Sequence, residues 1–253
     1  MPSADSTLPR IRLVTRGDDA GSCESANVAI LQAARHGVLR NVSVMVPGPA
    51  FDAAVPLLRS LPASICLGLH ITLNAEWETV KWPPVLPREQ TPSLVDEQGC
   101  FWPTPAEARG RGARVDEMLR EIEAQLDRAR SAGLALAYID EHMAVSRPWP
   151  DLRAGIAALA AREGLQDVDA VPGLPDVGAP GDVDAFLQAL DRAAPGAYVY
   201  VTHPGRDADD MRRFDGAGQV ARWRDADRRL LTDPSLPGAL AVRGVQVIRY
   251  TEL

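Results

Sequence analysis

Apolar runs alternate with amphipathic segments along most of the chain. The β-branched run IRLVT at residues 11–15 predicts a buried strand, and SANVAILQAARHG at 25–37 has apolar residues at helical spacing and ends on a glycine. Further strands are expected at residues 41–46, 65–73, 134–140, 197–202 and 245–250, and further helices near residues 51–61, 115–126, 151–163, 183–193 and 222–231. Repeated strand–helix units predict a parallel sheet.

One segment breaks this alternation. Residues 75–113 are rich in proline and aromatic residues, too long for an ordinary connection and too apolar for a disordered linker. We therefore expect an ordered functional excursion. Its tryptophans, Trp77, Trp82 and Trp102, could equally line a sugar site or fill core.

The repeated units favour an α/β fold in a single domain over residues 1–253, with residues 1–9 as a flexible N-terminus. The length permits one large domain or two, but no linker-like stretch or internal repeat divides the chain. A distorted (β/α) TIM-like barrel is favoured over an open sheet, although periodicity alone does not separate the two.

Charge and cysteine usage narrow the choice of partners. The formal charge of −7, with arginines interleaved among acids, argues against a nucleic-acid partner. Three cysteines at irregular spacing support neither a disulfide framework nor a thiolate zinc site. The N-terminus lacks a signal-peptide core, and no run approaches the roughly 20 apolar residues of a membrane span. These features predict a cytoplasmic protein.

Five ionisable residues lie at or near the ends of predicted strands: Asp18, Asp19, His70, His142 and His203. In parallel α/β folds the carboxyl ends of the strands form one face, and that face carries the chemistry. A carboxylate and two imidazoles can bind a divalent ion with positions left open, and a second acid can then act as a general base. Simpler roles compete with this one, since an Asp before a helix is commonly an N-cap and a single strand-end His is commonly a core residue.

Two nearby residues are set aside. His36 near a helix C-terminus favours the helix dipole, and Cys23 has no evident basic partner to lower its pKa, so we expect both to be structural.

The motifs together resemble the YdjC-like carbohydrate deacetylases, the family of the ChbG and HpnK proteins, almost from end to end. TRGDDAG matches the family's NADDFG pattern, GLHITLNAEW its GxHLTL segment, YIDEHM its HLDSH motif and VTHPG its HPG motif. NVSVMVPGPAFDAAV, TPSLVDEQGCFWP and RRLLTDP resemble further family segments in the right order. Arg16, Gly17, Ala20 and Glu141 depart from the usual pattern, so substrate preference does not transfer directly.

The resemblance implies a distorted barrel that removes an N-acetyl group from an amino sugar or oligosaccharide by hydrolysis. It implies Asp19, His70 and His142 as ligands of Mg²⁺ or Zn²⁺, Asp18 as general base and a supporting polar or acid role for His203. In this hypothesis a metal-bound water, deprotonated by Asp18, attacks the acetamide, and His203 protonates the leaving amine. Asp140 is a candidate to orient a ligand.

Other functions remain open at this point. They are another metal-dependent barrel hydrolase, a glycosidase using Asp18 with a distant acid, and a non-catalytic sugar-binding relative. The expected partner is a small-molecule or oligosaccharide substrate, with no membrane. A homodimer, the identity of the sugar and the choice of metal are left undecided.

Overall fold

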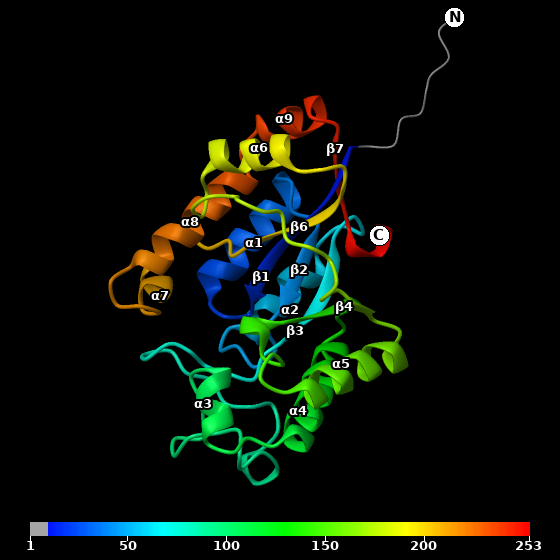
Figure 1. Cartoon of the computed structure of the whole chain (residues 1–253). Coiled ribbons are helices and arrows are strands. Elements are labelled where there is room, and N and C mark those ends of the chain that lie inside the picture. The colour runs from blue at the N-terminus through cyan, green and yellow to red at the C-terminus, as the bar shows by residue number, and fades with distance from the viewer. Residues whose placement is uncertain (1–9) are drawn as a thin grey trace, which may run out of the picture.

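A parallel sheet forms the centre of the structure, with helices packed around it (Figure 1). The computed structural model describes residues 10–253, so the flexible N-terminus expected over residues 1–9 lies outside the described residues. The strands are β1 (Ile11–Ala20), β2 (Asn41–Val44), β3 (Cys66–Ile71), β4 (Leu136–Glu141), β5 (Gln166–Asp167), β6 (Gly196–Thr202) and β7 (Val245–Ile248).

The helices follow the strands along most of the chain. They are α1 (Glu24–His36), α2 (Phe51–Arg59), α3 (Pro105–Gly110), α4 (Val115–Ser131), α5 (Pro150–Glu163), α6 (Val183–Arg192), α7 (Asp209–Arg212), α8 (Gln219–Leu231) and α9 (Leu236–Val242). Short 3-10 turns lie at Arg88–Gln90, His142–Ala144 and Tyr250–Glu252.

The sheet curls into a distorted barrel, which confirms the predicted fold class. Its order is β5-β4-β3-β2-β1-β6, with β7 also beside β1, and every pair is parallel. β5 and β6 do not pair within residues 10–253, and the segment that follows β5 makes a single parallel bridge to β6, between Gly173 and Val199. There the Leu174 amide donates to the Val199 carbonyl (2.8 Å) and the Val199 amide donates to the Pro172 carbonyl (2.9 Å).

The sequence pattern missed only short elements and one strand end. β5, α3, α7 and α9 span two to seven residues, too few for a periodic signal to develop. β1 is longer than expected, because it continues past Thr15 through both aspartates.

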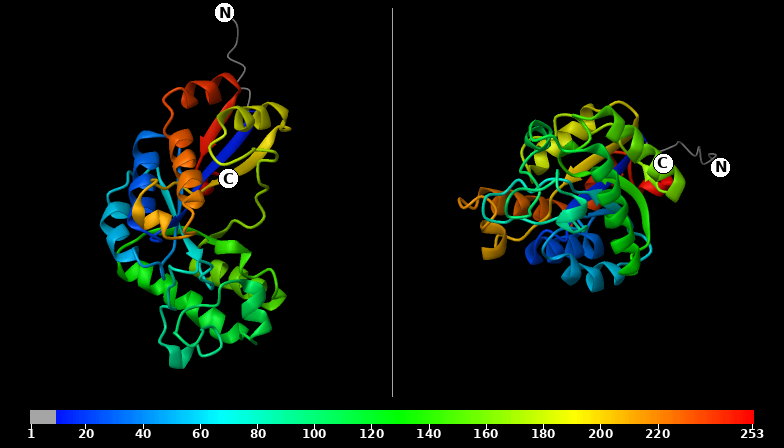
Figure 2. Two further views of the ribbon diagram at one scale, coloured as in Figure 1. Left: turned by 90° about the vertical axis from the view of Figure 1, so that its left-hand side faces the viewer. Right: turned by 90° about the horizontal axis from the view of Figure 1, so that it is seen from below.

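The excursion at 75–113 is ordered and packs beside α4, as Figures 1 and 2 show. Two buried glutamates of α4 hold it by accepting backbone N–H groups that would otherwise be unpaired. Glu121 accepts from the amides of Val85 (2.8 Å) and Leu86 (2.9 Å), and Glu117 accepts from the Ser93 amide (2.9 Å). The segment from Val85 to Ser93 is thereby fixed to α4.

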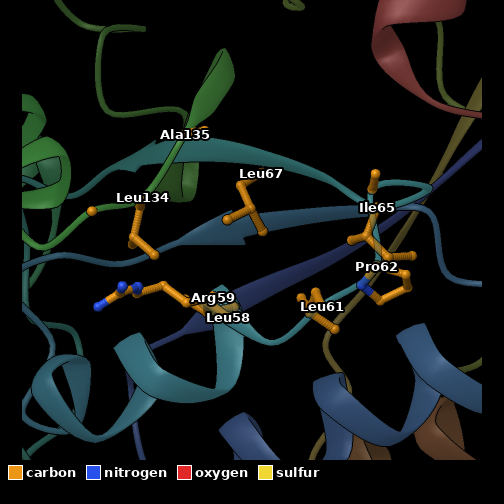
Figure 3. Close-up of a pocket in the computed structure, with 10 residues that line it drawn as sticks. Leu58, Arg59, Leu61, Pro62, Ile65, Leu67, Leu134 and Ala135 are labelled. Atoms are coloured by element: carbon orange, nitrogen blue, oxygen red, sulfur yellow. The ribbon is translucent and has the colours of Figure 1, made fainter.

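The opposite end of the sheet has a different character. A pocket of about 240 Å³ lies where β3 and β4 begin. Figure 3 shows the residues that line it, among them Leu61, Ile65 and Leu134. Arg59 is the charged side chain in this lining. In barrels this end of the strands serves stability rather than chemistry.

A helix that spans a membrane must be both long and apolar. No helix within residues 10–253 combines the length and the hydropathy that crossing a bilayer requires.

Candidate metal centre and active site

The carboxyl end of β1 is distorted where the two aspartates stand. Its register against β2 shifts between Gly17 and Ala20, and Asp19 has a φ of 68°, a left-handed conformation that Asp tolerates better than most residues. In a regular strand, adjacent side chains point to opposite faces. The bulge lets Asp18 and Asp19 both lie within reach of His70.

A glycine two residues later is required by the same turn. Gly21 has a φ of 106°, and a Cβ at this position would lie 2.5 Å from the Met45 carbonyl oxygen. Only glycine fits here without a backbone shift.

Asp19, His70 and His142 converge at one point although they come from three separate strand ends. Asp19 Oδ1 lies 3.4 Å from His70 Nε2 and 3.4 Å from His142 Nδ1, and the two ring nitrogens are 3.3 Å apart. All three side chains are buried. The backbone just after His142 is also strained, since Met143 and Ala144 have φ values of 50° and 49°.

The chemistry of this cluster fits a divalent metal ion. Within the described part of the chain, Asp19 Oδ1 is buried without a hydrogen-bond partner. Each imidazole presents one nitrogen to this oxygen and has a carboxylate at the other: Asp140 Oδ2 lies 3.1 Å from His70 Nδ1, and Glu76 Oε2 lies 3.1 Å from His142 Nε2. Histidine ligands of metals are typically oriented by such carboxylates.

Asp18 has different surroundings from its neighbour. Arg16 binds it through two parallel hydrogen bonds, Nε to Oδ1 (2.7 Å) and Nη2 to Oδ2 (2.8 Å). The same guanidinium contacts Asp140 Oδ2 (3.0 Å) and donates to the Tyr250 hydroxyl (3.3 Å). Asp18, His70 and Asp140 are also close enough to bind an ion, but Arg16 already supplies the positive charge there.

These contacts set the protonation states of the two acids. Burial by itself raises the pKa of Asp18, but the charges of Arg16 and His70 and the hydrogen bonds from Arg16 outweigh it and bring that pKa below its ordinary value. Burial also raises the pKa of Asp19, but Arg224, whose Nη2 lies 2.6 Å from Asp19 Oδ2, and the two imidazoles hold that pKa well below its ordinary value. Both acids are therefore ionised at neutral pH.

The imidazoles of the cluster are affected in the opposite direction. Burial opposes their charged form, but Asp140 and Asp18 raise the pKa of His70 to about 10. The nearby carboxylates of Asp19 and Glu76 likewise overcome burial and raise the pKa of His142 to about 9. A metal ion must displace these protons in order to bind.

His203 lies on a loop after β6, beside the same cluster. Its backbone amide donates to Asp227 Oδ2 (2.8 Å), which fixes the loop to α8. Burial and the nearby Arg224 charge lower the pKa of its imidazole, although Asp19 and Asp18 oppose this. His203 is therefore neutral at neutral pH.

The structure brings all five predicted site residues to the carboxyl ends of the strands. Asp18 and Asp19 are not helix caps, because Cys23 is the N-cap of α1. Burial raises the pKa of the Cys23 thiol to about 12, and His36 lies exposed in the last turn of α1, so neither takes part in the site.

Sequence reasoning did not single out Glu76, Arg224 and Asp227, and it noted Arg16 only as a departure from the family pattern. Arg224 and Asp227 lie in a helix whose sequence interleaves acids and bases, a pattern typical of a solvent-exposed surface. The GLHITLNAEW match did contain Glu76, three residues beyond the predicted strand at 65–73, which was an available signal.

Glu141 and Ala20, which also depart from the family's motif pattern, have structural roles. Glu141 accepts from the amide (2.8 Å) and hydroxyl (2.8 Å) of Ser146 and pairs with Arg153 (2.6 Å). It thus holds the turn after β4 without joining the cluster. Ala20 is fully buried in the core.

Fold and site together define a parallel α/β barrel protein with a buried Asp–His–His cluster at the carboxyl ends of its strands. The family model described as YdjC-like protein matches residues 12–242, and the chain belongs to this family. The family predicted from the sequence motifs is therefore confirmed.

Two relatives and one solved structure match nearly the whole chain. A carbohydrate deacetylase of Geobacillus stearothermophilus is 32% identical over 97% of this chain and 98% of its own. A chitooligosaccharide deacetylase of Enterobacter sp. (strain 638) is 28% identical over 95% and 98%. The crystal structure of a proposed cellobiose-phosphate cleavage protein from Enterococcus faecalis V583 has a TM-score of 0.81 at 22% identity, covering 95% of this chain and 98% of that one. This last likeness establishes the fold alone.

Proposed function

We propose that this protein is a metal-dependent carbohydrate deacetylase that hydrolyses the N-acetyl group of an amino sugar or N-acetylated oligosaccharide. One observation carries the metal dependence: the buried Asp19 Oδ1 has no partner among residues 10–253, yet two carboxylate-backed imidazole nitrogens face it. The names of its two full-length relatives support the substrate class.

The donor set favours zinc over magnesium. Asp19, His70 and His142 offer one oxygen and two nitrogens, and imidazole suits Zn²⁺, whereas Mg²⁺ prefers oxygen ligands. A divalent ion at this cluster would polarise the acetamide carbonyl and lower the pKa of a water.

Asp18 is proposed as the general base. Arg16 keeps it ionised and fixes its orientation, and each carboxylate oxygen retains a lone pair after accepting from the guanidinium. The base is therefore held in place before substrate arrives. Asp18 would take a proton from the attacking water.

His203 is proposed as the proton donor to the leaving amine. Because its pKa is lowered, the resting imidazole is neutral and must first gain a proton before it can give one. The proton taken from the attacking water is the natural source. Asp227, which holds the His203 backbone, keeps the ring at the edge of the cluster.

The cytoplasmic location predicted from the sequence is part of this proposal.

The test is release of acetate. Protein stripped of metal is assayed on N-acetylated mono- and oligosaccharides after addition of magnesium, zinc, cobalt or nickel. We expect release that depends on the metal and is largest with a transition metal. A protein that binds zinc tightly but releases acetate from none of these sugars would instead be a non-catalytic sugar-binding relative.

A further inference from the structure

A groove of about 210 Å³ adjoins the cluster on the side of His203 and Arg224. Trp77, Pro180, Val220, Trp223 and Asp227 complete its lining. Because His203 and Arg224 belong both to this groove and to the surroundings of Asp19, a ligand in the groove would lie next to the reacting centre.

One face of α8 builds most of the groove. Val220, Trp223, Arg224 and Asp227 follow the i, i+3, i+4, i+7 spacing that places side chains on one side of a helix. This single face binds Asp19 through Arg224 and the His203 backbone through Asp227, and it presents Trp223 beside them.

Trp223 is unusual for its exposure. It is 49% exposed and is the one aromatic side chain among the large exposed hydrophobic residues in the described chain. Trp77 stands in the same groove and is kept in orientation by an edge-to-face contact with Phe214, at 5.3 Å between ring centroids. Trp82, by contrast, is 1% exposed and belongs to the core, so the excursion tryptophans divide between the two roles.

Arg224 brings a guanidinium group with one unpaired donor to the inner edge of this apolar groove. Its side chain is 8% exposed, and one amino group, Nη2, binds Asp19. The other, Nη1, is buried and finds no hydrogen-bond partner in residues 10–253. A buried guanidinium nitrogen without a partner is costly, so a ligand oxygen in the groove would relieve that cost.

We infer that this groove is the binding subsite for the pyranose ring that bears the acetamide, with Trp223 as its stacking platform and Arg224 Nη1 as its polar anchor. A pyranose matches such a surface, because its C–H faces pack on aromatic rings while its edge oxygens accept hydrogen bonds. The inference rests on the proposed function for the identity of the sugar. It adds the position of the ring: on the α8 side, with the leaving nitrogen toward His203.

Binding to metal-free protein tests the subsite without turnover. The probe is the β-1,4-linked dimer of N-acetylglucosamine, titrated calorimetrically into wild type and variants. Trp223→Leu keeps an apolar side chain but loses the flat ring, so binding should weaken about tenfold. Trp223→Phe keeps a ring and should lose about threefold or less.

Two further variants complete the test. Arg224→Lys keeps a cation beside Asp19 but loses the planar fork, and it should also weaken binding about tenfold. Trp149→Leu removes a half-buried tryptophan outside the groove, at the N-cap of α5, and should leave binding within about twofold.

The outcomes separate this inference from the proposed function. If Trp223→Leu binds the dimer as tightly as wild type, the subsite is wrong even where acetate is released. If no N-acetylated sugar is hydrolysed but binding still depends on Trp223, the subsite stands and the deacetylase proposal fails.

Discussion

The two sides of the His70 ring offer an instructive comparison. On the Nε2 side, Asp19 keeps one oxygen free of hydrogen bonds, and His142 points at the same position. On the Nδ1 side, Asp140 Oδ2 contacts His70, Ser43 and Arg16, and Asp18 has both oxygens bound by that same arginine.

Both sides gather negative charge in a buried space, and both need a cation to offset it. On the Nδ1 side the chain supplies that cation itself, in Arg16. On the Nε2 side Arg224 reaches only one of the Asp19 oxygens. The difference teaches that adjacent, chemically identical acids acquire different electrostatic surroundings from the cations available to them.

Replacing each of the two acids in turn by asparagine should separate their proposed roles, and these variants should change zinc content and activity the most. Asp19→Asn removes an anionic ligand and should lose both bound zinc and activity. Asp18→Asn should reduce acetate release by about 10²- to 10⁴-fold while zinc content stays near one ion per chain, because a general base contributes that much to rate. Zinc is measured by mass spectrometry after gel filtration.

The reverse pattern would exchange the assignments. Zinc lost from Asp18→Asn and kept by Asp19→Asn would make Asp18 the ligand and Asp19 the base.

Removing the positive charge of Arg16 should test the Nδ1 side of the His70 ring. Arg16→Met leaves Asp18 and Asp140 buried without their shared positive charge, so the free energy of unfolding should fall by about 3–5 kcal/mol in urea titrations. Arg114→Met is the control, because its pair with Asp116 is solvent-exposed, and it should leave the free energy of unfolding close to that of the wild type. Equal losses in the two variants would mean that Arg16 is no more than a surface-type partner.

Zinc affinity should depend on pH in a defined direction. In metal-free protein the pKa is raised to about 10 for His70 and to about 9 for His142, and protonated imidazole cannot bind a metal. Affinity should therefore rise with pH, by about tenfold per unit for each proton displaced, and level off only above these values. Calorimetry in chelator-buffered zinc between pH 6 and pH 8 measures this slope. A flat profile would show that the imidazoles are already neutral without metal.

The smallest effect is expected from the carboxylate behind His142. Glu76→Gln should weaken zinc binding about tenfold, the lower end of the range for residues that orient metal ligands. Glu78→Gln, an exposed acid two residues along, is the matched control and should leave affinity unchanged. Competition with a chelator measures both. Equal zinc affinities in the two variants would show that Glu76 does not contribute to metal binding.

Several parts of the site could be anticipated from local pattern. The strand-end rule placed His70, His142 and His203 at one face, because parallel strands share a direction and so their carboxyl ends meet. His70 and Asp140 are direct register partners on β3 and β4, which explains why Asp140 orients His70 and not the histidine two residues beyond it.

Other parts of the site depended on tertiary geometry, which the spacing of apolar residues along the chain does not encode. The bulge at Asp18–Asp19 reorients a side chain by a single left-handed residue, and the pairing of Arg16 with Asp140 crosses from β1 to β4. Arg224 is 205 residues from Asp19 in sequence, within a helix whose interleaved charges read as solvent-facing.

The sequence by itself determined the class of fold, the family and the two aspartates and three histidines gathered at one end of the barrel, because strand periodicity and ordered motifs are local properties of the chain. Only the tertiary structure decided which cation stands beside each acid and which tryptophans face a groove rather than the core. Burial and charge pairing depend on residues brought together from distant strands, so they exist only once the barrel has closed around them.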